Sequence, residues 1–123
     1  MKKGLFLLTL IAIITACDSD PKTEVDTNQL LGKWEVNAAT RNGDKTSTLD
    51  QLYFTFAENG DMETNMPTLD RASTYELKGS TVQQRGNGVE NDYTIESLSD
   101  SELILVTTIR NTEFRMVLNK SPE

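Results

Sequence analysis

From Leu30 onward, apolar and polar residues alternate along short segments with turn residues between them, which restricts the folds open to this chain. Such alternation is typical of β-strands that bury one face of a sheet, because successive side chains point to opposite faces. No run of ten or more residues in this region follows the 3.6-residue period of a helix. The pattern predicts eight strands, at 33–39, 51–57, 61–66, 73–78, 81–85, 90–97, 102–109 and 113–119.

The apolar phase also predicts how neighbouring strands pair. A two-residue turn at Asn59-Gly60 would place the apolar residues of the second and third strands on opposite faces. A three-residue loop instead pairs Phe56 with Met62 and requires Gly60 to adopt the left-handed conformation.

Two later hairpins close in phase as well. A two-residue Gly79-Ser80 loop brings Leu77 opposite Val82, and glycine in its first position indicates a type II′ turn. The three hairpins together predict an all-β fold, a small eight-stranded antiparallel up-and-down barrel.

The last of these hairpins is predicted to turn at Asn111-Thr112. This loop pairs Ile109 with Phe114 and places Arg110 opposite Glu113 as an exposed ion pair.

The inward face of this sheet is expected to form the core. The run 103–106 is apolar on both faces, and we expect the N-terminal segment to cover its outer side. The predicted core residues are Trp34, Val36, Leu52, Phe54, Phe56, Met62, Met66, Tyr75, Leu77, Val82, Tyr93, Ile95, Leu105, Ile109, Phe114, Met116 and Leu118.

The first residues of the chain have the pattern of an export signal. Lys2 and Lys3 precede an uncharged, mostly apolar run at 4–16. Thirteen residues are too few for a membrane-spanning helix, which needs about 20, and suit the apolar region of a signal peptide.

This segment ends in Ile14-Thr15-Ala16-Cys17, which resembles the lipobox of bacterial lipoproteins. The resemblance implies that Cys17 receives diacylglycerol and an N-acyl chain such as palmitate and becomes the first mature residue. The protein would then be a lipid-anchored component of the bacterial cell envelope, at the outer membrane, on its periplasmic or its surface-exposed face. Removal of the leader takes away Lys2 and Lys3 and no acidic residue, so the net charge of −7 becomes −9.

These patterns divide the chain into four parts. We expect a lipoprotein signal peptide at 1–16, a lipidated cysteine with a disordered tether at 17–29, a barrel at 30–120 and a tail at 121–123. The tether is polar and contains a proline, a composition that does not form a packed core.

The composition argues against several classes of function. Histidine is absent and Cys17 is the sole cysteine, which excludes Ser-His-Asp triads, histidine-based zinc sites and disulfide frameworks. The excess of acidic over basic residues, 19 to 12, argues against nucleic acid as a partner. Asp18 and Asp20 do not continue into a calcium-binding loop. The sequence therefore predicts no catalytic residues, no metal, no cofactor and no enzymatic activity.

Several short segments resemble the lipocalin-like domain of small bacterial lipoproteins. They are Leu30-Leu31-Gly32-Lys33-Trp34, the Phe54–Gly60 hairpin, Tyr75–Gly79, and Tyr93–Ser99 running into Leu103–Leu105. The resemblance implies a barrel whose floor is closed by Trp34 under a cation from a late strand. Arg110 and Arg115 are the candidates for that cation.

Two functional hypotheses remain open from the sequence. In the first, the barrel binds a small apolar or amphipathic molecule. In the second, the same side chains fill the interior, and the protein is a non-enzymatic interaction or structural module of the envelope. The candidate ligand-lining or core residues are Trp34, Phe54, Phe56, Tyr75, Tyr93, Phe114 and Met116.

Overall fold

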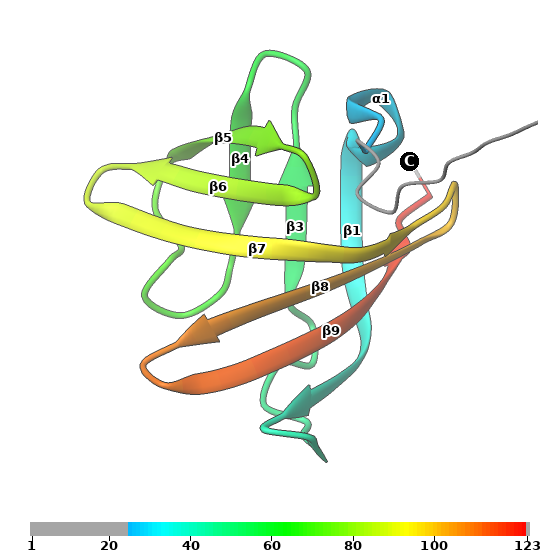
Figure 1. The fold of residues 1–123 in the computed structure, drawn as a ribbon, viewed down its shortest axis with the longest axis vertical. Helices are drawn as coiled ribbons and strands as arrows, with labels where there is room; N and C mark the ends of the chain where they lie inside the picture. Colours follow the sequence, from blue (N-terminus) through cyan, green and yellow to red (C-terminus); the bar gives the residue numbers. More distant parts are fainter. Residues whose placement is uncertain (1–24, 123) are drawn as a thin grey trace, which may run out of the picture.

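Nine antiparallel strands form a single sheet that closes on itself (Figure 1). The structure is a computed structural model, and it describes residues 25–122. The strand order is β2-β1-β3-β4-β5-β6-β7-β8-β9, and an additional pairing of β1 with β9 closes the barrel. The strands are β1 (Gly32–Arg41), β2 (Asp44–Lys45), β3 (Tyr53–Phe56), β4 (Asp61–Thr64), β5 (Ser73–Lys78), β6 (Thr81–Gly86), β7 (Val89–Leu98), β8 (Glu102–Ile109) and β9 (Thr112–Lys120).

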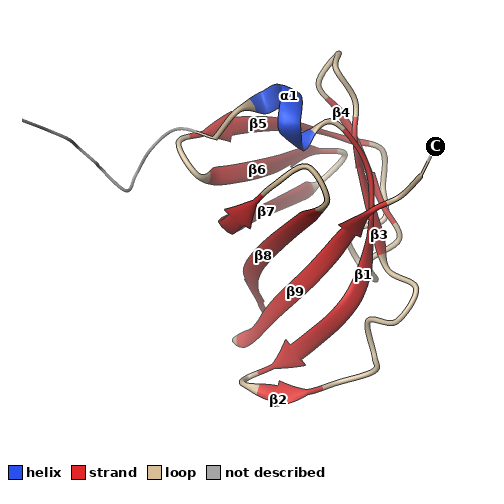
Figure 2. Ribbon diagram, turned by 90° about the vertical axis from the view of Figure 1, so that its right-hand side faces the viewer, coloured by secondary structure: helices blue, strands red, loops and turns tan. Residues whose placement is uncertain are grey.

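The predicted eight-stranded up-and-down barrel is confirmed, with one extra strand. Strand β2 has two residues and pairs only with the end of β1 (Figure 2). It is therefore a short extension of the sheet and not a ninth strand of the closed barrel. Because neighbouring strands run in opposite directions, the connections gather at two ends of the barrel. We call the end with the β3–β4, β5–β6 and β7–β8 turns the closed end. The end with loops 42–52, 65–72, 87–88 and 110–111 is the open end.

Two of the three predicted hairpin registers are confirmed. Phe56 pairs with Met62, and Gly60 has a φ of 96°, as the three-residue loop requires. Leu77 pairs with Val82 across a turn in which Gly79 has a φ of 61°. In both hairpins a glycine occupies a left-handed position that other residues adopt only at a cost.

The predicted register of the last hairpin is wrong by two residues. Ile109 pairs with Thr112, and Phe114 lies opposite Thr107. The turn consists of Arg110 and Asn111, which both have positive φ, 53° and 66°, the signature of a type I′ turn. A shift of two residues leaves every side chain on its original face, so apolar alternation cannot detect the difference. The expected pairing of Arg110 with Glu113 does not form, because Glu113 lies opposite Thr108.

The predicted core is confirmed, and the structure adds members to it. Every residue of the predicted inward face is buried or packs as a partly buried side chain against the buried cluster. The predicted core omits six buried apolar residues, three within strands and three in α1 or the open-end loops, and four buried polar residues. The additional residues are Leu30, Ala39, Leu49, Leu69, Val89, Leu103, Thr64, Ser73, Gln84 and Thr107.

The prediction of a disordered tether up to residue 29 is wrong for its last residues. Asp26 caps a one-turn helix, α1 (Thr27–Leu30), by accepting a hydrogen bond from the Asn28 amide at 3.0 Å. Val25 packs against the core and Leu30 is fully buried in it. Apolar anchors at both ends of this short segment outweigh its polar composition.

The remaining N-terminal predictions, the signal peptide, the lipidation of Cys17 and residues 18–24 of the tether, lie outside the described residues. Within residues 25–122, no helix has the length and hydropathy needed to cross a membrane. On the outer face of β8, Ile104 and Val106 are half-buried. Most of the N-terminal segment that is expected to cover them lies outside the described residues.

Candidate functional site at the open end of the barrel

At the closed end, Trp34 is fully buried and held in place by two contacts. Its indole Nε1 donates a hydrogen bond to the Leu30 carbonyl at 2.8 Å, and the Lys120 ammonium lies 4.5 Å from its ring centroid. Lys120 also donates to the Leu31 carbonyl at 2.6 Å. A Cβ on Gly32 would lie 2.9 Å from Lys120 Cε, so the glycine makes room for this cation.

This arrangement corrects the expectation for the cation. Lys120, not Arg110 or Arg115, covers the tryptophan. Arg110 is in the turn at the opposite end, and Arg115 pairs with Glu96 at 2.8 Å on the outer face. The interior of the closed end is therefore filled by Trp34 and the groups that hold it.

One interior wall of the barrel is polar and internally satisfied. Tyr93 donates its phenolic hydrogen bond to Gln84 Oε1 at 2.6 Å, and both side chains are fully buried. Gln84 Nε2 donates in turn to Ser73 Oγ at 3.0 Å and to the Leu69 carbonyl at 3.2 Å. Burial raises the pKa of Tyr93 well above its ordinary value, because the phenolate would lose its hydration.

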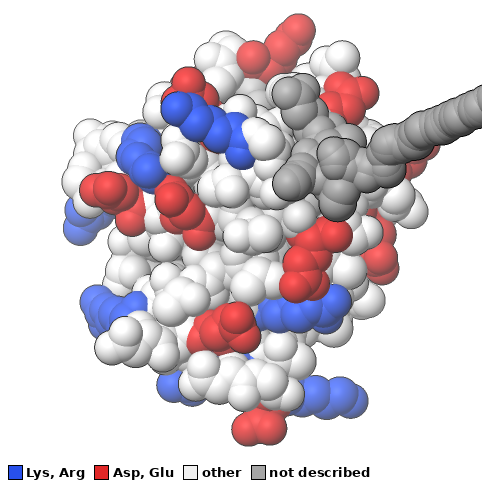
Figure 3. Space-filling model, in the orientation of Figure 1, with Lys and Arg blue, Asp and Glu red and all other residues white. Residues whose placement is uncertain are grey.

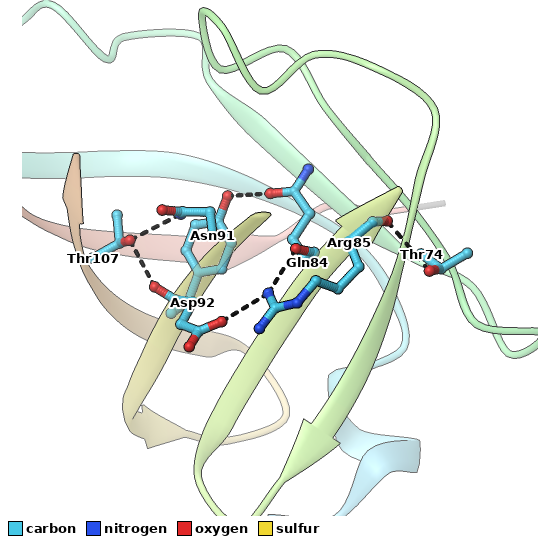
Figure 4. Close-up of polar contacts among 7 residues, drawn as sticks. Thr74, Gln84, Arg85, Asn91, Asp92 and Thr107 are labelled. Atoms are coloured by element: carbon cyan, nitrogen blue, oxygen red, sulfur yellow. Dashed lines mark hydrogen bonds and ion pairs between the residues drawn. The ribbon is translucent and has the colours of Figure 1, made fainter. Parts of the chain in front are cut away.

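A second set of polar contacts ties β6, β7 and β8 together beside this wall (Figure 4). Thr107 accepts a hydrogen bond from Asn91 Nδ2 at 2.9 Å and donates one to the Asp92 carbonyl at 2.8 Å. The Asp92 carboxylate pairs with Arg85 at 2.9 Å. Since these groups hydrogen-bond or pair with one another, they fix the positions of the three strands along this wall.

Most of the candidate ligand-lining or core residues lie in the packed interior. Trp34, Tyr93, Phe54, Phe56 and Met116 are at most 1% exposed. Phe54 contacts Tyr93 edge-on at 5.4 Å between ring centroids, and Phe56 contacts Tyr75 in the same manner at 5.1 Å. Tyr75 is half-buried, and its hydroxyl donates to the Ala57 carbonyl at 2.9 Å. Phe114 is also half-buried, and of these seven residues it alone lines the cavity described next.

A cavity of about 290 Å³ opens at the open end, where the inner face of the sheet meets three loops. Its floor and walls are mainly apolar, and the charged groups among its lining residues are both arginines. The lining residues are Arg41, Thr48, Leu49, Met66, Pro67, Thr68, Ile109, Arg110, Thr112 and Phe114. Sequence reasoning identified Phe114, Ile109 and Met66 as inward-facing, but it did not assign a site to this end. The loop residues Leu49 and Thr68 carried no signal, because they follow no strand alternation.

Backbone strain is concentrated at the same end. All six non-glycine residues with positive φ among residues 25–122 lie in the connections of the open end. Two of them, Thr68 (φ 69°) and Arg110 (φ 53°), line the cavity. Thr68 is β-branched, for which a left-handed conformation is a genuine outlier. Residues held in such conformations often mark ligand sites, because the surrounding structure must impose them.

The cavity lining offers few groups that ligate metals. Within residues 25–122, no three His, Cys, Asp or Glu side chains gather as they would around a metal ion. The cavity lining offers hydroxyls, guanidinium groups and apolar surface, in a concave site of the kind that holds small molecules.

Comparison with known proteins agrees with this geometry. The family described as "Lipocalin-like domain" matches residues 30–105, more than half of the chain. The chain belongs to the lipocalin-like domain family. No curated protein matches the sequence at a significant level.

Two solved structures share the lipocalin-like fold. A lipocalin-like protein from Bacteroides uniformis superposes with a TM-score of 0.55 and is 17% identical, covering 76% of this chain and 99% of that chain. A protein from Bacteroides eggerthii gives a TM-score of 0.54 at 16% identity, covering 74% of this chain and 98% of that chain. At this level of identity the likeness shows the lipocalin-like fold alone.

Proposed function

We propose that this protein is a lipid-anchored lipoprotein whose barrel binds a small apolar or amphipathic molecule in the cavity at its open end, without catalysing a reaction. The observation that carries the proposal is the cavity itself, about 290 Å³ with apolar walls from Leu49, Met66, Ile109 and Phe114. Ligand pockets are concave, mostly apolar and marked by a few placed polar groups, and this site has each of these properties.

The test is to fill the cavity and compare with a matched change outside it. Thr112 lines the cavity. Thr108 lies on the neighbouring strand, but its side chain is on the outer face of the sheet and is exposed. Thr112→Trp should abolish the binding of apolar probes, measured by calorimetry and by the NMR shifts of the Phe114 ring and Met66 methyl. Thr108→Trp should leave binding unchanged. Equal binding by the two variants would contradict the proposal.

Trp34 fluorescence is a poor reporter for this experiment. The indole is fully buried at the closed end beneath Lys120, away from the residues that line the cavity. We therefore expect probes to leave the Trp34 emission nearly unchanged, even when the NMR signals of Phe114 shift.

The lipid anchor is the second part of the proposal. Its support is the sequence Ile14-Thr15-Ala16-Cys17 behind a charged start and an apolar run of signal-peptide length. In cells fed labelled palmitate, Cys17→Ala should abolish labelling and leave the unprocessed precursor, whereas Ser19→Ala should be labelled normally. Fractionation of the labelled protein would then test its assignment to the outer membrane.

The packed interior favours one other candidate function. Because the buried aromatic residues fill the barrel below the cavity, the protein could act through its outer surface as an envelope interaction module. In that case Thr112→Trp would preserve function in the cell, and no apolar molecule would copurify with the native protein.

A further inference from the structure

We infer that the ligand of the open-end cavity is an amphipathic anion, a carboxylate on a short apolar chain whose charged head binds Arg41 and Arg110. The inference rests on the proposed function and specifies the class of ligand that the site takes. It follows from the charges around the cavity, the direction of Arg41 and the size of the apolar space.

The charged residues that line the cavity are positive, whereas the net charge of the chain is negative. Acidic residues outnumber basic ones by 19 to 12 in the whole sequence, yet the charged lining residues are Arg41 and Arg110. On the face shown in Figure 3, acidic and basic side chains are interspersed and form no basic patch. Positive charge around an apolar space in an acidic protein indicates a ligand that carries the negative charge itself.

Arg41 belongs to the inner face of the sheet. It lies opposite Phe114 in the β1–β9 ladder and follows Ala39, whose partner is the fully buried Met116. Since side chains of the same phase share a face, Arg41 is the last inward-facing residue of β1 and stands directly above the apolar wall. An arginine at such a position extends its apolar stem along the wall and presents its guanidinium group at the rim.

Within residues 25–122, neither arginine forms an ion pair. The three ion pairs among residues 25–122 join Lys33 to Glu35, Arg85 to Asp92 and Arg115 to Glu96. Asp44 is opposite Arg41 in the short β1–β2 ladder, but the two side chains make no ion pair.

The guanidinium group suits a carboxylate. It is always charged and presents its donors in a planar fork, which binds the two oxygens of a carboxylate through parallel hydrogen bonds. Arg110 is held at a positive φ in the β8–β9 turn, so a strained backbone fixes where its side chain begins. Two such groups on adjoining elements would hold the head of the ligand while its chain contacts Leu49, Met66 and Phe114.

The volume limits the length of the chain. At roughly 30 Å³ for each water-sized group, a cavity of about 290 Å³ holds about ten non-hydrogen atoms. Octanoate has this size and chemistry and is therefore the probe of choice. Octan-1-ol and octylamine have the same chain with a neutral and a cationic head.

The experiment compares these three probes by titration calorimetry on the full chain. Octanoate should bind about ten- to a hundredfold more tightly than octan-1-ol, the range expected for a charged hydrogen-bonded head group. Octylamine should bind most weakly. Because exposed charges are screened by salt, raising the ionic strength should weaken octanoate binding and leave octan-1-ol binding unchanged.

Variants assign the effect to the two arginines. Arg41→Gln and Arg110→Asn should each reduce octanoate affinity about tenfold or more while affecting octan-1-ol little; asparagine keeps the positive φ of the turn accessible. Arg115→Gln makes the same change in net charge on the outer face and should leave octanoate affinity unchanged. Circular dichroism and Trp34 emission confirm that each variant is folded.

The outcomes separate the two proposals. If octan-1-ol binds as tightly as octanoate and Thr112→Trp abolishes both, the cavity binds apolar molecules but the anion inference is wrong. The inference is also wrong if octanoate binding survives both Arg41→Gln and Arg110→Asn. If none of the probes binds, or if Thr112→Trp has no effect on binding, the proposed function itself fails.

Discussion

At the scale of single residues, the hydrogen bond between Tyr93 and Gln84 joins two side chains that are both fully buried. Tyr93 donates its hydroxyl hydrogen to Gln84 Oε1, whereas the Gln84 amide nitrogen has partners of its own. Removing one partner of such a pair leaves the other desolvated and unpaired, which costs more than the bond itself contributes.

The Tyr93→Phe substitution should therefore lower the free energy of unfolding by about 1–3 kcal/mol at neutral pH. It should also change the alkaline pH dependence. Burial raises the pKa of Tyr93 in the folded protein, so above the unfolded value of about 10 the unfolded chain releases a proton that the folded chain keeps. Stability is then full below that pH and falls as the pH rises further.

Urea denaturation between pH 8 and 11 checks both effects, because Tyr93→Phe should flatten the alkaline decline. Tyr75→Phe serves as the control. Tyr75 is half-buried and donates to a backbone carbonyl, so its loss should cost less. A Tyr93→Phe protein as stable as the parent would show that the buried pair contributes nothing.

Thr68 carries backbone strain that a substitution can release. It occupies the third position of the turn at 66–69, which the Leu69 amide closes by donating to the Met66 carbonyl at 3.0 Å. Proline precedes it and its φ is 69°, the pattern of a type II turn, in which glycine or asparagine is preferred.

Thr68→Gly should raise the free energy of unfolding by about 1 kcal/mol, the strain relieved less the entropy of the added glycine. Thermal unfolding measures this change. Thr48→Gly, in the neighbouring loop and without a positive φ, should instead destabilise the protein. Destabilisation by Thr68→Gly would mean that Thr68 is not strained.

At the scale of elements, the pairing of β1 with β9 decides whether the sheet closes. Seven residue pairs join these two strands, with a bulge between Val36 and Ala38. Lys120, at the end of β9, reaches across to the Leu31 carbonyl and covers Trp34. The side chain thus fastens the first and last strands of the barrel to each other and to the segment that follows α1.

Lys120→Met keeps the apolar stem of this side chain and removes its charge. We expect a loss of about 1–3 kcal/mol in the free energy of unfolding, from the cation–π contact and the hydrogen bond. The Trp34 emission should shift as well, because the cation no longer lies over the ring.

Lys78→Met, on the exposed face of β5, is the matched control and should change stability by less than about 0.5 kcal/mol. Denaturant titration followed by Trp34 emission compares the two variants. If Lys120→Met were as stable as Lys78→Met, the Lys120 ammonium would not contribute to the stability of the barrel.

The register of the β8–β9 hairpin could not be predicted from the sequence pattern. Alternation correctly assigned the inward face of both strands, because it depends only on phase. It could not distinguish a turn at Asn111-Thr112 from the observed turn at Arg110-Asn111, since the two registers place the same residues inside. The choice depends on which pair can adopt positive φ within the closed sheet.

At the scale of the whole molecule, the two ends of the barrel have different roles. The closed end holds α1, the buried tryptophan and its lysine, and the described chain begins there (Figure 1). The open end holds the cavity and the strained loops. If Cys17 is lipidated as proposed, the anchor joins the closed end, and the cavity opens at the end farther from the attachment.

The folded unit should begin at Val25, before the first predicted strand. A chain starting at Val25 should unfold in one cooperative transition with the stability of the longer protein. A chain starting at Gly32 loses Leu30, which is fully buried, and the carbonyl that Trp34 donates to. We expect it to be less stable by about 3 kcal/mol or more.

Circular dichroism and Trp34 emission, followed through the same urea titration, provide the comparison. Equal stability of the two chains would show that α1 is not part of the folded unit.

The sequence by itself determined the class of fold, the number of barrel strands, most of the core and two hairpin registers. Each of these depends on the local alternation of apolar and polar residues or on a glycine in a turn. Both features can be read from neighbouring residues in the sequence. The tertiary structure alone decided that Lys120 covers Trp34, that Tyr93 donates to Gln84, and that Arg41 and Arg110 line one cavity. These contacts join residues of different strands and loops, so their geometry exists only once the sheet has closed.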